Sequence, residues 1–191
     1  FFNGGVEKPH VGEDFFIIPS QKVESYASVP QMSSPIIRDE VVRRVKAYDV
    51  YNYKFILINF ANPDMLGHTG NYDATVRGNE IVDSLTADIS KAVLSMGGAI
   101  VITADHGNCE TMINRVTKEV DIAHTNNPVP LMILSSMDDI VPKAGTHLVK
   151  VGTGPHAQAT GLLADVAPTC LGLLGLDAPE SMTGVDLRNI I

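Results

Sequence analysis

Tryptophan is absent from this chain of 191 residues, and cysteine occurs only twice. Two thiols are too few for the disulfide framework of a small secreted protein, and they suit the reducing cytosol. No apolar run approaches the roughly 18–20 residues that a membrane helix requires. We therefore expect a cytoplasmic protein that has no membrane segment.

Basic residues are also scarce: the chain has 14 Lys and Arg but 22 Asp and Glu, which gives a formal net charge of −8. This balance argues against a nucleic-acid partner, since Lys and Arg must supply the phosphate contacts. The same balance is unusual for an enzyme that acts on anionic substrates. Such an enzyme would need metal ions, or arginines from another segment, to supply positive charge.

An opening methionine is missing too, and the chain starts with Phe1-Phe2-Asn3-Gly4-Gly5. Two aromatic residues before Asn-Gly-Gly are typical of a strand that runs into a turn. We therefore expect this chain to be a fragment whose natural start lies upstream.

What is present is a hydrophobic fraction of 45% without low-complexity runs, which indicates one globular α/β unit. Apolar runs predict buried strands, and apolar residues at helical spacing predict helices. The predicted strands cover 15–18, 54–60, 99–103 and 129–134, the predicted helices cover 34–48, 72–96 and 162–174, and a small hairpin is predicted at 114–120. Because strand, loop, helix and strand follow one another from 54 to 103, we expect a right-handed parallel crossover.

Acidic and histidine side chains follow two of these predicted strands. The candidate metal ligands are Asp64, His68, Asp105, His106 and His124. The first two follow the strand predicted at 54–60, and the next two follow the strand predicted at 99–103. Ligands in open α/β sheets collect beyond the carboxyl ends of the strands, so we expect these side chains to converge.

The donor atoms indicate which metal this site would take. Carboxylate oxygen and imidazole nitrogen suit Mn²⁺ or Zn²⁺ better than Ca²⁺, which prefers an all-oxygen shell. Five protein ligands exceed what one catalytic ion takes while it keeps an open position. Two ions about 3.5–4 Å apart would use all five ligands and could clamp a phosphoryl group.

Plainer interpretations exist for each residue taken alone. Any one of the histidines could be an ordinary hydrogen-bonded histidine, Asp105 could be a helix N-cap, and Asp64 could belong to a plain turn. Cys109 neighbours the site but has no partner cysteine, so we expect packing rather than ligation. Further residues that we expect to stay outside the site are His10, His147, His156 and the glycines of 152–154.

Six stretches of the chain resemble one known family. They are Phe-Phe-Asn-Gly-Gly (1–5), Ile-Pro-Ser (18–20), Asn-Phe-Ala-Asn-Pro-Asp-Met-Leu-Gly-His-Thr-Gly (59–70), Thr-Ala-Asp-His-Gly-Asn (103–108), His-Thr-Asn-Asn-Pro-Val-Pro (124–130) and Leu-Ala-Asp-Val-Ala-Pro-Thr (163–169). The chain resembles the cofactor-independent phosphoglycerate mutases of the alkaline phosphatase superfamily. The resemblance implies a three-layer α/β/α fold with a mostly parallel sheet, incomplete in this chain. Residues 1–191 would be the C-terminal portion of the metal-binding phosphatase domain, without its N-terminal portion and without the substrate-binding domain.

The resemblance also implies a reaction and a division of roles. The family moves a phosphoryl group between the 3- and 2-hydroxyls of glycerate in glycolysis and gluconeogenesis, through a phosphoserine and without 2,3-bisphosphoglycerate. Of two Mn²⁺ ions, one would be held by Asp64, His68 and His124, and the second in part by Asp105 and His106. The serine nucleophile and the arginines that bind substrate lie upstream in the family, so we expect no catalytic residue in this chain. The chain alone is then inactive, and the intact enzyme is expected to be a monomer.

Two other functions stay open at this point. Within the same superfamily, the protein could be a phosphopentomutase or a phosphatase. Alternatively, it could be a metal-binding module without catalysis.

Overall fold

The computed structural model describes residues 2–6, 8–135 and 159–189. Its elements in chain order are η1 (Phe2–Gly5), η2 (Tyr26–Ser28), α1 (Ser34–Lys46), α2 (Tyr48–Tyr51), α3 (Asn62–Gly67), α4 (Tyr72–Ser95), β1 (Ala99–Thr103), β2 (Leu131–Ser135), η3 (Leu163–Asp165), α5 (Val166–Leu173) and η4 (Leu187–Asn189). None of the helices in this described part combines the length and apolar character that a membrane span requires.

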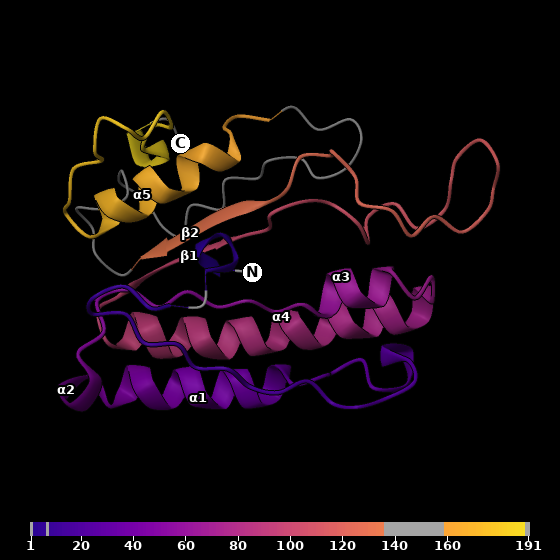
Figure 1. The fold of residues 1–191 in the computed structure, drawn as a ribbon, viewed down its shortest axis with the longest axis horizontal. Coiled ribbons are helices and arrows are strands. Elements are labelled where there is room, and N and C mark those ends of the chain that lie inside the picture. Colours follow the sequence, from indigo (N-terminus) through magenta and orange to yellow (C-terminus); the bar gives the residue numbers. More distant parts are fainter. Residues whose placement is uncertain (1, 7, 136–158, 190–191) are drawn as a thin grey trace.

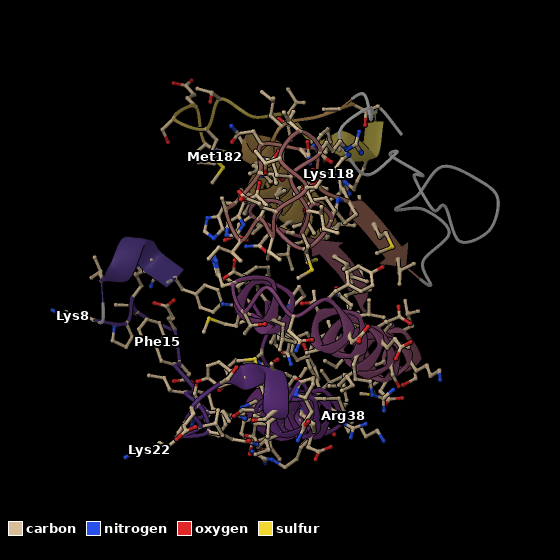
Figure 2. All side chains as sticks on the ribbon, turned by 90° about the vertical axis from the view of Figure 1, so that its right-hand side faces the viewer. Lys8, Phe15, Lys22, Arg38, Lys118 and Met182 are labelled. Atoms are coloured by element: carbon tan, nitrogen blue, oxygen red, sulfur yellow. The ribbon has the colours of Figure 1, made fainter. Side chains whose placement is uncertain are left out.

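Helices lie on both sides of a small sheet. Figure 1 shows α5 on one side of β1 and β2, and α4 with α1 on the other. The view at right angles keeps this layering, with Arg38 of α1 towards one end and Met182 towards the other (Figure 2). The α/β class predicted from the sequence is therefore confirmed.

The long helix α4 is the support on which the site is built. The Asn71 side chain caps its start by accepting a hydrogen bond from the Ala74 N–H at 3.0 Å. Leu85 and Ile89 are buried on its apolar face, and the helix ends before Gly97, whose φ is +74°. Helices α1 and α3 and strand β1 all pack against it.

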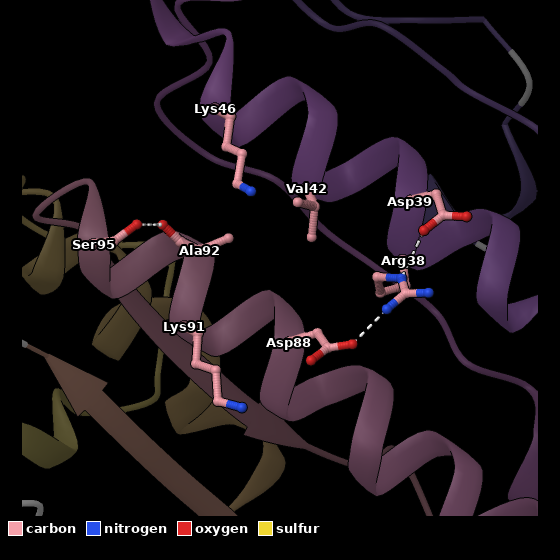
Figure 3. A pocket seen from close by; sticks show the side chains of 8 residues that line it. All are labelled: Arg38, Asp39, Val42, Lys46, Asp88, Lys91, Ala92 and Ser95. Carbon is pink, nitrogen blue, oxygen red and sulfur yellow. Dashed lines mark hydrogen bonds and ion pairs between the residues drawn. The ribbon is translucent and has the colours of Figure 1, made fainter.

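The groove between α1 and α4 contains charged side chains (Figure 3). It encloses about 510 Å³, and Arg38 reaches across it to pair with Asp88 while contacting Asp39 at 2.7 Å. Lys46 and Lys91 line the same groove. None of the five candidate metal ligands lines it, so the groove is separate from the site described below.

Strands β1 and β2 pair antiparallel, with Ala99 opposite Ser135 and Thr103 opposite Leu131. Both strands occur where the sequence predicted them. The predicted parallel crossover is wrong for the described residues, because they contain only this antiparallel pair.

The segment 54–60 explains the difference. It forms no strand, and neither does 15–18. Phe55 and Leu57 are 54% and 58% exposed as whole residues, although an apolar run of this kind predicts a buried strand. A strand requires a hydrogen-bonded neighbour, and no described residue pairs with this segment.

The remaining predictions fall on the second half of the chain. The hairpin predicted at 114–120 is a tight turn closed by one antiparallel bridge between Ile113 and Val120. The helix predicted at 162–174 begins as η3 and continues as α5. The loop predicted between β2 and that helix lies almost entirely at 136–158, outside the described residues.

Candidate metal centre

Helix α3 carries Asp64, and His68 directly follows the helix as its C-cap. The two residues are one helical turn apart, and His68 Nε2 lies 3.1 Å from Asp64 Oδ1. The helix is held in place by its buried side: Leu66 is fully buried next to Gly78 of α4, and Asn62 donates a hydrogen bond to the Pro30 carbonyl at 2.7 Å. A short helix thus gains a fixed position by packing on a long one.

His124 reaches the same place from the loop before β2. A backbone bridge positions that loop, because the Thr125 N–H donates to the Gly107 carbonyl at 2.8 Å. His124 Nε2 then lies 3.0 Å from Asp64 Oδ1 and 2.9 Å from His68 Nε2. Three side chains from two distant segments thus meet at one point.

A backbone carbonyl selects the tautomer of the neutral His68 ring. His68 Nδ1 lies 2.8 Å from the Ile122 carbonyl oxygen. A carbonyl only accepts hydrogen bonds, so Nδ1 carries the proton and donates it. In the neutral ring, Nε2 then presents a lone pair towards His124 and Asp64. This is the arrangement that metal-binding histidines have in proteins.

The distances within the trio Asp64, His68 and His124 fit a metal ion. Ligand atoms about 2.1 Å from a shared ion, at angles of 90–110°, lie roughly 3.0–3.4 Å apart. The three separations here are 2.9, 3.0 and 3.1 Å. Electron-rich atoms at this distance repel one another unless a proton or a cation lies among them. The trio is also the only such group of His, Cys, Asp or Glu within the residues that the structure describes.

Asp105 and His106 are placed differently. The His106 ring stacks on the His124 ring, with centroids 3.8 Å apart and planes 22° apart. The Asp105 side chain is 90% exposed and contacts His106 Nε2 at 3.6 Å. The structure therefore brings His106 against the trio, while Asp105 stays at its edge. Whether the five side chains bind metal stays a prediction.

The residues expected to stay outside the site can be located in part. His10 is exposed, and Cys109 is half-buried against Asn79 of α4. Burial raises the pKa of the Cys109 thiol. His147, His156 and the glycines of 152–154 lie outside the described residues.

Polar residues that the sequence did not single out surround the trio. Asn108 is buried, and its amide nitrogen lies 3.4 Å from Asp64 Oδ1. Glu110 accepts hydrogen bonds from its own loop and from the loop of His124. The Asp-His-Gly-Asn stretch drew attention to this loop, but nothing in the spacing indicated that Glu110 folds back onto it.

Comparisons with known proteins agree with this geometry. The sequence profile of the Metalloenzyme superfamily matches residues 1–178. The chain is 43% identical over its whole length to the 2,3-bisphosphoglycerate-independent phosphoglycerate mutase of Clostridium tetani, and 44% identical over 187 residues to that of Thermomicrobium roseum. It spans about a third of each relative, 33% in both cases.

A solved structure extends the comparison to the fold. The crystal structure of Leishmania mexicana phosphoglycerate mutase at low cobalt concentration superposes with a TM-score of 0.75 and 32% sequence identity. The match covers 93% of this chain and 32% of that one. The resemblance drawn from the motifs is therefore confirmed, and so is the fold class as a partial version of the fold of these mutases.

Proposed function

Because the chain belongs to the Metalloenzyme superfamily, we propose that it is the C-terminal, metal-binding part of a cofactor-independent phosphoglycerate mutase. The intact enzyme would interconvert 3-phosphoglycerate and 2-phosphoglycerate in glycolysis and gluconeogenesis, without 2,3-bisphosphoglycerate. One observation carries the proposal: Asp64, His68 and His124 converge at 2.9–3.1 Å in a chain more than 40% identical to such mutases.

The trio would hold one ion, for which we propose Mn²⁺. When bound, such ions neutralise charge on a phosphoryl group and lower the pKa of a coordinated hydroxyl. The side chains of His68 and His124 are 39% and 49% exposed, so this edge of the site is open to a substrate phosphate. The Ile122 carbonyl keeps the His68 ring in the orientation that presents Nε2.

Asp105 and His106 would contribute to a second ion. They supply one carboxylate and one imidazole, which is only part of the shell that a tightly held ion needs. We therefore propose that this chain binds the second ion weakly, and that the missing ligand comes from another part of the intact enzyme. The nucleophilic serine and the arginines that bind phosphoglycerate would come from that part as well.

The charge of the chain bears on where the intact protein would bind its substrate. The formal charge of −8 leaves this chain without the positive charge that an anionic substrate requires, which fits a substrate-binding region elsewhere in the protein. A cytoplasmic monomer that acts on a small phosphorylated acid, without nucleic acid or membrane, is the proposed context.

Metal binding by the 191-residue chain can be tested by calorimetric titration with Mn²⁺ and Co²⁺. Asp64→Asn and His124→Ala should each weaken the first equivalent by more than the roughly 10–100-fold typical of changes around a metal site. The exposed His10→Ala is the matched control and should bind as the parent does. Equal affinity in all four proteins would overturn the assignment of the trio.

The activity needs a separate assay on the intact protein. It should turn over 3-phosphoglycerate but neither a pentose phosphate nor p-nitrophenyl phosphate, and the 191-residue chain alone should turn over none of them. Turnover of pentose phosphate or of the generic ester by the intact protein would favour a phosphopentomutase or a phosphatase. No turnover of any of the three would favour a metal-binding module without catalysis.

A further inference from the structure

The Glu110 carboxylate connects the two loops on which the metal centre depends. Its Oε2 accepts a hydrogen bond from the Asn108 N–H at 2.7 Å. Its Oε1 accepts from the Asn127 side-chain amide at 2.8 Å and also from the Thr125 hydroxyl. One acid therefore holds its own loop and the loop that carries His124.

Two of these contacts, those to Asn108 and Thr125, involve residues that adjoin a proposed ligand. Asn108 is 6% exposed, and its amide nitrogen lies 3.4 Å from Asp64 Oδ1. Thr125 directly follows His124 in the sequence. Glu110 thus fixes the backbone of the residue that contacts Asp64 and, separately, the residue next to His124.

Glu110 is an exposed residue, but its carboxylate lies close to Gly107 and Thr125. A Cβ atom on Gly107 would overlap both the Thr125 hydroxyl and the Glu110 carboxylate. Glycine at this position therefore permits the close approach of the two loops. The backbone bridge between Gly107 and Thr125 closes the same contact from the other side.

The charge state suits this role. Burial opposes ionisation of Glu110, but the hydrogen bonds from Thr125, Asn127 and backbone N–H groups outweigh it and lower the pKa of Glu110. The carboxylate is therefore ionised at neutral pH and acts only as an acceptor. Hydrogen bonds to an ionised acceptor are stronger than those between neutral groups.

We propose that Glu110 is a positioning residue of the metal centre: its carboxylate joins the loop of Asp105–Glu110 to the loop of His124–Asn127, so that Asp64 and His124 are presented together. The inference deepens the proposed function, because it takes the trio as the metal site. Glu110 itself contacts none of the proposed ligands and would act through Asn108 and Thr125.

The test compares the parent chain with Glu110→Ala, Glu110→Gln and a control. Glu119→Gln is the matched control, since Glu119 is an exposed acid in the nearby turn and only its backbone is hydrogen-bonded. Co²⁺ affinity and the visible absorption of bound Co²⁺ report on the ligand geometry. Glu110→Ala should weaken affinity about 10–100-fold and change the absorption, with Glu110→Gln in between and the control unchanged.

A second measurement needs no metal. The imidazole resonances of His124 and His68 in the metal-free chain should shift in Glu110→Ala but not in Glu119→Gln, and circular dichroism confirms that each variant is folded. Unchanged imidazole resonances, or unchanged Co²⁺ affinity and absorption in folded Glu110→Ala, would overturn the inference. If the parent chain binds no Co²⁺ or Mn²⁺, the proposed function fails, and the metal-free resonances alone decide the role of Glu110.

Discussion

The His106 ring stacks on the His124 ring, with centroids 3.8 Å apart and an angle of 22° between the planes. His124 also approaches His68, at a centroid distance of 4.8 Å and an angle of 48° between the ring planes. His124 therefore contacts two imidazoles, one from the loop after β1 and one that directly follows α3. This stack joins the two proposed metal positions.

Replacing His106 separates packing from ligation. His106→Phe keeps a ring against His124 and should leave the affinity for the first metal equivalent nearly unchanged. His106→Ala removes the ring and should weaken the affinity for the first metal equivalent about 2- to 10-fold. This corresponds to the ~0.5–1.5 kcal/mol of an aromatic pair. Calorimetric titration with Co²⁺ measures both. A loss in His106→Phe as large as that in His106→Ala would show that the ring nitrogens, rather than packing, support the first ion.

Gly67 is the point where α3 meets the loop after β1. A Cβ on Gly67 would overlap Asn108 Oδ1 and lie 2.8 Å from Asn108 Cγ. Gly67→Ala should therefore destabilise the chain by about 1–3 kcal/mol, the usual cost of overpacking a buried contact. Urea unfolding followed by circular dichroism measures this. In a double-mutant cycle with Asn108→Ala, the combined loss should be smaller than the sum of the single losses; additive losses would show that the two residues do not clash.

Asp165 links the C-terminal segment to α5 and should make its stability depend on pH. Its carboxylate accepts hydrogen bonds from the Leu162 N–H at 2.7 Å and the Val185 N–H at 2.9 Å, and these two bonds lower the pKa of Asp165 from 3.8. A carboxyl with a lowered folded-state pKa stabilises the fold above its unfolded pKa, and this stabilisation is lost as pH falls through the folded pKa. The parent chain should therefore lose stability below about pH 4.

The variant that checks this is Asp165→Asn, with the exposed Asp177→Asn as control. Asp165→Asn should be less stable than the parent at pH 7, and its free energy of unfolding should fall less on acidification. Asp177→Asn should have the same stability as the parent at each pH. Amide hydrogen exchange in α5 at pH 5 and urea unfolding between pH 3 and 7 give the two readouts. A parallel acid response in Asp165→Asn and the parent would contradict the role of this carboxylate.

The exposed segment 54–60 should cause the isolated 191-residue chain to self-associate. Extended apolar backbone with free N–H and C=O groups is a template for pairing with another chain. Leu57→Lys should lower the average mass at high concentration in sedimentation experiments. Val116→Lys, at a 90% exposed position in the turn before Val120, serves as control and should not. Equal masses for parent and Leu57→Lys would show that this segment does not mediate association.

Local sequence patterns correctly predicted those helices and strands whose packing or pairing partners lie within the described chain. The apolar residues of α4 recur at helical spacing, and the helix ends at Gly97 as expected. The run at 99–103 became β1 because a second apolar run, at 129–134, supplied a partner. The run 54–60 is as apolar, yet it has no partner in the described chain. Propensity alone does not make a strand.

The candidate site, like the fold, could be predicted from the sequence only in part. Asp64 and His68 stand one helical turn apart, so their proximity could be inferred from spacing. Their grouping with His124 on one ion was an implication of the family resemblance and did not follow from spacing or ligand chemistry. The contacts of Glu110 could not be inferred, because its partners Thr125 and Asn127 lie 15 and 17 residues further along the chain. Only the folded backbone brings such residues together.

The distance along the chain between His68 and His124 has a consequence of its own. These residues are 56 positions apart, yet their Nε2 atoms lie within 2.9 Å. An ion coordinated by both histidines would cross-link the two ends of a large loop, as a disulfide does. The cross-link would thereby reduce the entropy of the unfolded state. Unlike a disulfide, this cross-link would be removed by a chelator. The rigidity of everything between α3 and β2 would then follow the free metal concentration around the protein.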